Sequence, residues 1–392
     1  MLPKKLQKKL DERTANNSLR KLGAVTNLID FSSNDYLGFS KNKTIFKRTA
    51  EILNTENLKL NGATGSRLLS GNHQLYEQAE QQIAKFHNTE SALVFNSGYV
   101  ANLGFFSSVP QRGDLIFYDE LCHASIRDGI KMSDAKSYKF RHNNLKDLTS
   151  RCHVERPPAE RAGSRNLHET FEIYVVTESV FSMDGDQPDL KLLTDFCTQN
   201  GFHLIIDEAH ALGVFGNNGE GLVQELGLEQ EVFARLVTFG KALGCHGAAI
   251  LGSKALQEYL INFARSFLYT TALSPHTVAT IISGYEELSK TPEKVRLQSN
   301  IEMFQNEIAA RQLESHFIES NSAIISCIIP GNDRVKHISE ILKKKGFDVK
   351  PILSPTVPKG QERLRICLHS YNKHEDISHL IKQLHSLLKK DV

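Results

Sequence analysis

The sequence predicts an α/β fold: a large domain built on a mainly parallel central sheet flanked by helices, followed by a smaller α+β domain. Between about residues 75 and 275, short apolar runs of strand length alternate with stretches of helical spacing, which is typical of parallel strands covered on both faces. After Ser274-Pro275, long helical stretches dominate. We therefore divide the 392 residues into an N-terminal helix and arm (1–40), a large α/β domain (41–275) and a C-terminal α+β domain (276–392).

The N-terminal region is predicted to be a helix followed by an irregular arm. Leu6, Leu10 and Leu19 lie on a polar background over about residues 4–21, which favours a surface helix. The next stretch, IDFSSNDYLGF at 29–39, is rich in turn formers and alternates too little for a strand. We therefore expect an irregular arm there.

Helices and strands alternate through the large domain. Leu75, Ala79, Ile83 and Phe86 recur at helical spacing, and the apolar run 91–95 follows them. Further strand-like runs lie at 115–118, 171–177, 203–206, 236–239 and 248–251. Because ligands in open α/β sheets bind outside the carboxyl ends of the strands, functional side chains are expected at those ends.

The last part of the chain is predicted to pack helices on a small sheet. Helical spacing covers roughly 277–314, 333–345 and 375–388, and strand-like runs lie at 323–329 and 363–368. Such an arrangement makes a compact α+β domain.

The composition is that of an ordinary globular protein. There are 47 Lys plus Arg against 45 Asp plus Glu, a formal net charge of +2, which argues against a protein that coats nucleic acid or an anionic membrane. No apolar run approaches the roughly 18 residues of a membrane span, and the first residues lack the apolar core of a secretory signal. We expect a cytoplasmic protein. Residues 155–167, with two prolines and several charges, are expected to form a surface loop whose role the sequence does not give.

The six cysteines form no C-x-x-C pair, which is typical of reduced thiols in the cytosol. Cys122, Cys152 and Cys245 each precede a histidine. Adjacent side chains rarely ligate one zinc ion, and the paired spacing of zinc sites is missing. We expect no metal site.

Two strand ends carry chemically useful residues. The stretch LIIDEAHALG runs from an apolar strand into Asp207 and His210, and a carboxylate there can hold a cationic ring nitrogen. The stretch LVTFGKALG places Lys241 between glycines after another strand, where a partly desolvated amine can attack a carbonyl. Taken alone, Asp207 could equally cap a turn and Lys241 could be solvated.

Two further places could bind a ligand, one of them a phosphate and the other an aromatic ring. Residues 96–99 lie between a strand and a helix, so backbone N–H groups there can hold a phosphate, with Thr238, Thr270 and Thr271 as further donors. His123 begins a helix after a strand, where an imidazole can stack on an aromatic ring. An ordinary, partly buried histidine is the alternative.

Two nucleotide-binding interpretations fail. The letters DEAH also occur in a group of helicases, but such enzymes need a G-x-x-x-x-G-K-[ST] loop, and Gly240-Lys241 is followed by Ala242. A dinucleotide site needs G-x-G-x-x-G after the first strand, and Gly62-Ala63-Thr64-Gly65 has the wrong spacing and no strand before it.

Taken together and in order, these segments resemble the α-oxoamine synthases, which are pyridoxal-phosphate enzymes of fold type I. The departures are Leu212, where Thr or Ser is common, and the enlarged stretch 155–167. The matching segments are SSNDYLG (32–38), GATGSRLLSGN (62–72), FNSGYVAN (95–102), DELCHASIRDG (119–129), TESVFSMDGD (177–186), DEAHALGVFG (207–216), TFGKALG (238–244) and SPTVPKG with RLRI (354–366).

The resemblance implies how pyridoxal 5′-phosphate would be held. Lys241 would bind the cofactor aldehyde covalently and move protons at the substrate α-carbon. Asp207 would pair with the pyridine nitrogen and keep it protonated, so that the ring accepts electrons. His123 would stack on the ring face, and His210 with Ser182 would hydrogen-bond the phenolic oxygen.

The same resemblance implies a phosphate site and a dimer. Gly98, Tyr99 and Thr238 would hold the phosphate and the ring edge. Thr270 or Thr271 would reach the phosphate from a neighbouring subunit, which implies a homodimer with shared active sites.

The family condenses an amino acid with an acyl thioester, releasing CO₂ and a free thiol. Here residues 238–251 are most similar to members that join L-alanine to a pimeloyl thioester on the route to biotin. Arg20, Thr356 and Arg365 resemble substrate-binding positions, and His123 is expected to contact the substrate as well as the cofactor. Bidentate arginine suits a carboxylate. The sequence has no short motif that shows whether coenzyme A or an acyl carrier protein carries the thioester.

Three alternatives remain open. Glycine C-acetyltransferase and serine palmitoyltransferase would use the same catalytic set with other pockets. An ordinary aminotransferase would share Asp207 and Lys241 but should lack His123 in its DELCHAS setting. A non-catalytic partner subunit is the non-enzyme alternative, and Lys241 argues against it.

Overall fold

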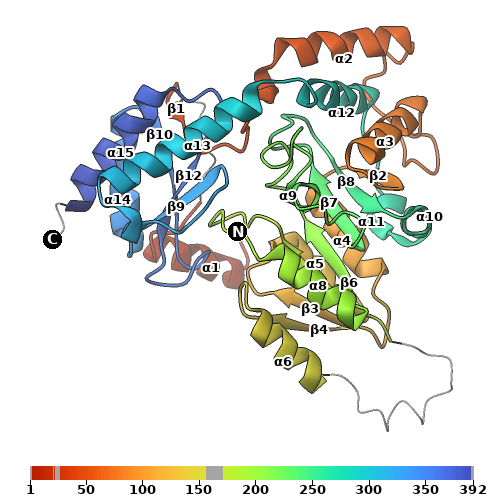
Figure 1. The fold of residues 1–392 in the computed structure, drawn as a ribbon, viewed down its shortest axis with the longest axis horizontal. Coiled ribbons are helices and arrows are strands. Elements are labelled where there is room, and N and C mark those ends of the chain that lie inside the picture. Colours follow the sequence, from red (N-terminus) through yellow and green to blue (C-terminus); the bar gives the residue numbers. More distant parts are fainter. Residues whose placement is uncertain (1, 21, 23–26, 156–170, 390–392) are drawn as a thin grey trace. The chain divides into compact units, whose positions relative to one another are not determined.

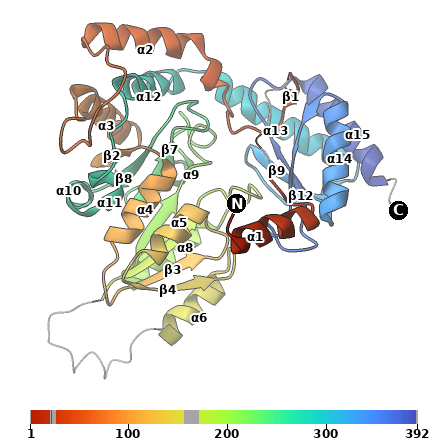
Figure 2. The same ribbon diagram turned by 180° about the vertical axis from the view of Figure 1, so that it is seen from behind.

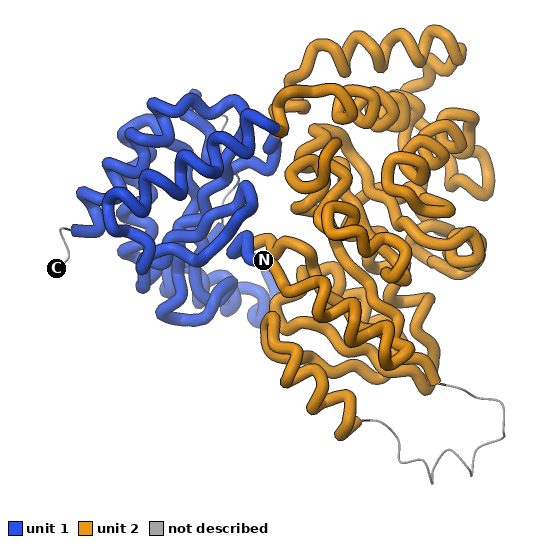
Figure 3. The backbone as a smooth tube through the Cα atoms, viewed as in Figure 1, with its two compact units in different colours: residues 1–36, 183–186, 295–392 blue, residues 37–182, 187–294 orange. Residues whose placement is uncertain are grey.

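The computed structural model describes residues 2–20, 22, 27–155 and 171–389, which form two compact units (Figure 3). Unit 1 contains residues 1–36, 183–186 and 295–392, and unit 2 contains residues 37–182 and 187–294. The expected surface loop 155–167 lies, except for Glu155, outside the described residues. The division therefore falls after residue 294 rather than at 275, and the N-terminal arm groups with the C-terminal part of the chain.

Unit 2 is built on a seven-stranded sheet in the order β2-β8-β7-β6-β5-β3-β4 (Figure 1). Every strand except β8 runs in the same direction. This confirms the predicted α/β fold with a mainly parallel sheet. The strands are β2 (Ser91–Phe95), β3 (Leu115–Asp119), β4 (Lys136–Phe140), β5 (Ile173–Glu178), β6 (His203–Asp207), β7 (Ala234–Thr238) and β8 (Ala248–Gly252).

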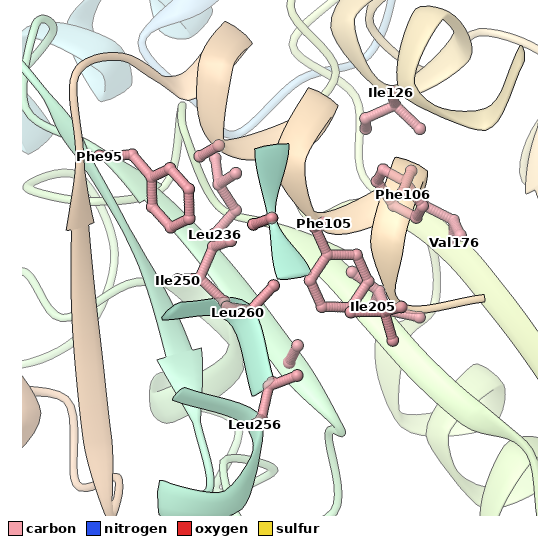
Figure 4. Close-up of a cluster of buried hydrophobic side chains, with 14 of the residues drawn as sticks. Phe95, Phe105, Phe106, Ile126, Val176, Ile205, Leu236, Ile250, Leu256 and Leu260 are labelled. Atoms are coloured by element: carbon pink, nitrogen blue, oxygen red, sulfur yellow. The ribbon is translucent and has the colours of Figure 1, made fainter. Parts of the chain in front are cut away.

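Helices cover both faces of this sheet (Figures 1 and 2). On one face, side chains of α4, α5, α10 and α11 pack with the strands in an apolar cluster that includes Phe95, Phe105 and Leu236 (Figure 4). On the other face, α6, α8 and α9 pack on a second cluster. The helices of unit 2 are α2 (Lys43–Thr55), α3 (Gln74–Phe86), α4 (Gly98–Ser108), α5 (Ala124–Lys131), α6 (Leu145–Glu155), α8 (Leu190–Asn200), α9 (Leu222–Glu225), α10 (Lys254–Phe263), α11 (Arg265–Leu268) and α12 (Pro275–Leu288), with a short 3₁₀ turn at Phe39–Lys41.

Burial explains why most strands of this sheet were predictable and the edge strand β4 was not. All residues of β2 and β5 are buried, as continuous apolar runs require. Strand β4 escaped prediction because four of its five residues, KSYKF, are only partly buried or exposed. Strand β8 pairs antiparallel with both β2 and β7, an orientation that its apolar run does not encode.

The Ser274-Pro275 pair marks a helix start and not a domain boundary. Ser274 caps α12 by accepting a hydrogen bond from the Thr277 backbone N–H, and Pro275 occupies the first turn. Both residue types are typical of these positions. Helix α12 then packs on α2 and α3 within unit 2.

Unit 1 is the α+β part. A three-stranded antiparallel sheet has the order β11-β12-β9, and the two-residue strand β1 in the arm pairs in parallel with β10. Helix α1 is shorter than the predicted 4–21 and has no buried residue. The elements are α1 (Lys4–Ala15), β1 (Ile29–Asp30), α13 (Glu293–Ala310), a 3₁₀ turn (Glu314–His316), β9 (Ile324–Ile328), α14 (Asn332–Lys344), β10 (Phe347–Asp348), β11 (Lys350–Ile352), β12 (Arg363–Cys367) and α15 (His374–Leu388). Among the described residues, no helix is both long and apolar enough to span a membrane.

Candidate active site

The carboxyl ends of the parallel strands of unit 2 carry most of the residues singled out from the sequence. Asp207 ends β6, Thr238 ends β7, and Lys241 lies in the turn after β7. Gly98 follows β2, and His123 follows β3 at the start of α5. Because parallel strands end at one edge of a sheet, the topology gathers these five residues.

Asp207 is buried, with 6% of its surface exposed. One carboxylate oxygen, Oδ1, accepts the backbone N–H of Ala209 at 2.9 Å. The other, Oδ2, accepts the Asn102 side-chain amide at 3.0 Å. A buried carboxylate held by two donors has a fixed orientation, as a partner for a cationic ring nitrogen must have.

A hydrogen-bonded chain connects Asp207 with the His123 ring. The Asn102 amide nitrogen also donates to the Ser125 hydroxyl at 3.0 Å. That hydroxyl lies 2.8 Å from His123 Nδ1, which also accepts the Ser125 backbone N–H at 3.2 Å. Since Nδ1 accepts, the proton of the neutral ring is on Nε2. The chain of bonds fixes both the rotamer and the tautomer of His123.

Glu178 is a further buried carboxyl group beside this chain. It ends β5 and is the register partner of Asp207. Its Oε1 accepts the His123 backbone N–H at 2.5 Å. Burial, reinforced by the neighbouring charge of Asp207, raises the pKa of Glu178 to about 8, although Lys241 and the His123 N–H oppose the shift. At neutral pH Glu178 is thus mainly protonated.

Lys241 is half-buried, and its backbone carbonyl accepts the N–H of Gly244 at 2.8 Å, which closes a tight turn. Its ammonium lies close enough to act electrostatically on Glu178 and His123. The pKa of His123 is lowered, first by desolvation and then by Lys241, while Asp207 opposes the change. His123, Glu178 and Lys241 are therefore near enough to influence one another electrostatically.

The start of α4 forms a cradle that has no room for a side chain. A Cβ built on Gly98 would lie 2.5 Å from Thr238 Cγ2, so only glycine fits. Ser97 caps the helix by accepting the Val100 N–H at 3.2 Å. The first N–H groups of α4 are thus presented beside Thr238, which is the arrangement that binds phosphate. Tyr99 is exposed, and its hydroxyl donates to Asp128 Oδ2 at 2.6 Å.

The remaining candidates in unit 2 lie on segments next to these strands. His210 is buried directly after β6, and Ser182 is half-buried in the loop after β5. Thr270 and Thr271 lie between α11 and α12, and the Asn96 side chain donates to the Thr271 carbonyl at 2.7 Å. The loop after β2 is therefore tied to the threonine segment of the same chain.

Besides His123, the predicted substrate residues lie in unit 1, where Arg20 contacts Thr356 and Arg365 contacts Asn34 of the arm. Arg20 is exposed and donates from Nη2 to the Thr356 hydroxyl at 3.1 Å. Arg365, on β12, donates from Nη2 to Asn34 Oδ1 at 3.0 Å. The structure thus brings Arg20 to Thr356, and Arg365 to the arm.

Three residues of the site escaped the sequence analysis: Asn102, Ser125 and Glu178. Asn102 lies four residues after Gly98 on α4, one helical turn along, so it faces the same side. Ser125 lies two residues after His123. Glu178 ends an apolar strand, as Asp207 does. An acidic residue at the end of an apolar run was therefore the sequence signal that could have revealed it.

The residues present fit pyridoxal phosphate. The group needs a buried carboxylate for its ring nitrogen, an amine for its aldehyde and an anion cradle for its phosphate. Asp207, Lys241 and the Gly98 helix start supply one of each. Among the described residues, no cluster of three or more metal-ligating side chains occurs.

Known proteins resemble this chain over nearly its whole length. The family profile described as aminotransferase class I and II matches residues 26–384. An 8-amino-7-oxononanoate synthase from Emericella nidulans is 39% identical over 381 residues, covering 92% of this chain and 90% of the relative.

Two solved structures give the same result. An 8-amino-7-oxononanoate synthase from Francisella tularensis is 29% identical with a TM-score of 0.76, covering 93% of this chain and 98% of that one. A serine palmitoyltransferase from S. paucimobilis, with a bound PLP–myriocin aldimine, is 25% identical with a TM-score of 0.86, covering 99% and 97% of the two chains.

Proposed function

Because this chain belongs to the class I and II aminotransferase family and, within it, to the α-oxoamine synthases with pyridoxal 5′-phosphate as cofactor, we propose that it makes 8-amino-7-oxononanoate for biotin synthesis. The substrates would be L-alanine and a pimeloyl thioester, and CO₂ and the free thiol would be released. The observation that carries this reaction class is the bonded chain from Asp207 to His123 beside Lys241, because an ordinary aminotransferase is expected to lack His123 in that setting.

When bound, the cofactor supplies an electron sink for negative charge that develops at the substrate α-carbon. Asp207 would hold its pyridine nitrogen, and the neutral Glu178 next to it would leave one negative charge at that place. His123 would cover the ring face in the orientation set by Ser125 and Asn102. His210 and Ser182 would donate to the phenolic oxygen.

Lys241 would hold the cofactor aldehyde through Nζ and, once displaced by the amino acid, take the proton from the α-carbon. Its electrostatic interaction with both His123 and Glu178 supports both roles, since nearby groups set how readily Nζ gains or loses a proton. The same amine would return a proton after CO₂ leaves.

The phosphate would lie at the start of α4, held by the backbone of Gly98 and Tyr99 and by the Thr238 hydroxyl. Thr270 or Thr271 of a second copy would complete this site, so we propose a homodimer. The six cysteines, all among the described residues, form no disulfide with one another, which supports a cytoplasmic location.

Arg365, Arg20 and Thr356 would bind substrate carboxylates. The guanidinium of Arg365 is already oriented by Asn34, which favours a fixed ion pair over a flexible one. The thioester carrier would be coenzyme A or an acyl carrier protein.

A serine palmitoyltransferase activity is the second candidate, since that structural neighbour has the higher TM-score of 0.86. The 39% identity to the 8-amino-7-oxononanoate synthase favours the first candidate.

A matrix of substrates separates the candidates. The cofactor-loaded protein is incubated with L-alanine, glycine or L-serine and with pimeloyl, acetyl or palmitoyl thioesters of coenzyme A and of acyl carrier protein, and thiol release is followed. The highest rate is expected with L-alanine and a pimeloyl thioester. A highest rate with L-serine and palmitoyl, or with glycine and acetyl, would reject the proposal. Amino-group transfer without thiol release would assign an ordinary aminotransferase.

A further inference from the structure

In unit 1, the arm segment 30–36 runs beside residues 367–372 of the C-terminal part. Two backbone hydrogen bonds of 2.8 Å join them, from Cys367 N to Phe31 O and from Ser370 N to Tyr36 O. Between these two points the arm is irregular and has no ladder of its own. Something other than a β-sheet must therefore fix its middle, which contains Ser33 and Asn34.

His369 occupies that position and is completely buried. Its Nδ1 lies 3.1 Å from Asn372 Oδ1, which is an acceptor, so Nδ1 carries the ring proton. Its Nε2 lies 3.1 Å from the Ser33 hydroxyl and 3.1 Å from the Ser33 carbonyl oxygen, so two groups of Ser33 face this nitrogen. Burial lowers the pKa of His369, although Asp30 opposes the shift.

The neighbours of His369 hold the start of the arm. The Asn372 amide donates to the Asp30 carbonyl at 2.9 Å, and the Tyr371 hydroxyl donates to Asp30 Oδ2 at 3.0 Å. Asp30 Oδ1 accepts the backbone N–H groups of Ser32 and Ser33, both at 2.9 Å. The turn is thus folded over Asp30 on one side and closed by His369 on the other.

A side chain of α13 also holds this network in place. The buried Asn300 side chain donates to the carbonyls of His369 and Asn372 at 2.8 and 2.9 Å. The rings of His369 and Tyr371 are stacked, with centroids 4.7 Å apart and planes 13° apart. With its backbone, both nitrogens and one ring face engaged, His369 has a single available orientation.

The arm residue that follows Ser33 contacts a predicted substrate residue. Asn34 Oδ1 accepts from Arg365 Nη2 at 3.0 Å and from the Tyr36 hydroxyl at 3.2 Å. A shift of the Ser33–Asn34 backbone would therefore move the acceptor that orients the Arg365 guanidinium. Displacements of about 1 Å in such positioning contacts can change rates and affinities by one or two orders of magnitude.

We propose that His369 is a positioning residue for amino-acid binding: by holding Ser33, it keeps Asn34 against Arg365 and so preorganises the guanidinium for the substrate carboxylate. The proposal rests on the proposed function, in which Arg365 binds that carboxylate. Asp30, Tyr371 and Asn372 support the same arrangement.

The test compares two amides at one position. In His369→Gln the amide reaches the place of Nε2 and can still bond Ser33, whereas in His369→Asn it reaches only the place of Nδ1 and bonds Asn372. L-alanine is titrated into the cofactor-loaded enzymes, and the change in cofactor absorbance gives its dissociation constant. We expect it to rise about tenfold in the Asn variant and to stay within about threefold of wild type in the Gln variant.

Equal affinity of all three proteins for L-alanine would overturn the proposal, and so would an equal loss in both variants, which indicates a general packing defect. Backbone hydrogen exchange of residues 31–36 is measured in parallel on the cofactor-free proteins. Faster exchange in His369→Asn than in His369→Gln supports the positioning role. If the wild-type enzyme gives no response to L-alanine, that result rejects the proposed function but leaves the exchange result valid. Unchanged exchange would reject the positioning role.

Discussion

The sheet edge of unit 2 and the arm junction of unit 1 fix functional side chains in opposite ways. At the sheet edge, charged groups such as Asp207 and Lys241 follow regular strands, and the parallel topology gathers them. At the arm junction, where residues 30–36 run beside residues 367–372, side chains such as His369 and Asn372 hold an irregular backbone through individual hydrogen bonds. A regular parallel sheet thus brings functional side chains together through the positions of its strand ends. An irregular backbone segment instead needs a hydrogen-bond partner for each of its buried polar groups.

The largest expected effect tests the charged edge. Lys241→Ala removes the amine proposed to hold the aldehyde and move the α-proton, so thiol release should fall by about a thousandfold or more. The aldehyde-linked absorbance band of the bound cofactor should also disappear. Lys254→Ala, at the exposed start of α10, is the matched control and should keep both. A band that persists in Lys241→Ala would show that another amine holds the cofactor.

The next effect concerns the charge of the buried carboxylate. Asp207→Asn keeps a side chain of the same shape but removes the negative charge at the pyridine nitrogen, so turnover should fall by about a hundredfold or more. The measurement is the turnover number at saturating cofactor, with Asp195→Asn on the exposed side of α8 as control. Near wild-type turnover in Asp207→Asn would remove this residue from the ring site.

A third, smaller effect tests the cradle at the start of α4. Gly98→Ala places a methyl group 2.5 Å from Thr238 Cγ2, and overpacking of this kind costs about 1–3 kcal/mol. We expect lower thermal stability and weaker cofactor binding, measured by unfolding curves and by cofactor titration.

Two variants sharpen this experiment. Gly62→Ala adds the same atom where nothing lies within 4 Å and should be nearly neutral. Adding Thr238→Ser to Gly98→Ala removes the opposing methyl group and should restore part of the loss. If Gly98→Ala alone behaves as Gly62→Ala does, the cradle is not tightly packed.

The smallest effect is a pH dependence of stability. Burial raises the pKa of Glu178 from its ordinary value of 4.5 to about 8 in the folded protein. Between pH 4.5 and about 8, Glu178 is ionised in the unfolded chain but protonated in the folded protein. The free energy of unfolding therefore falls as the pH rises, and the stabilising contribution of protonated Glu178 is lost above about pH 8. Glu178→Gln, which cannot ionise, should lack this decline in the cofactor-free protein.

The free energy of unfolding of both proteins is measured from pH 5 to 9, with Glu77→Gln on the exposed side of α3 as control. Parallel pH curves for wild type and Glu178→Gln would mean that Glu178 is ionised when folded.

The positions of the residues at the sheet edge could be predicted from the sequence because a local pattern determines them. Asp207 and Lys241 follow apolar runs that could only be buried strands, so their place at the carboxyl edge followed from the alternation of helices and strands. The same argument applies to His123 and Gly98, each between a strand and a helix. Their roles come from the family resemblance and remain predictions.

Contacts between distant residues were out of reach. The bond from Asn102 to Asp207 spans 105 positions, and that from Ser33 to His369 spans 336. Such pairs depend on how strands are ordered and on an irregular arm, neither of which has a sequence period. The polar edge strand β4 and the capping role of Ser274 were missed for local reasons, since exposed residues and turn formers occur in loops as well.

The most direct test of the account is the stoichiometry of the reaction with L-alanine and a pimeloyl thioester. The cofactor-loaded enzyme is given L-alanine labelled at its carboxyl carbon, and labelled CO₂ and free thiol are measured together. Release of both in equal amounts, with 8-amino-7-oxononanoate as product, is the predicted result. Thiol release without labelled CO₂, or conversion of L-alanine to its keto acid, would contradict a decarboxylative condensation at this site.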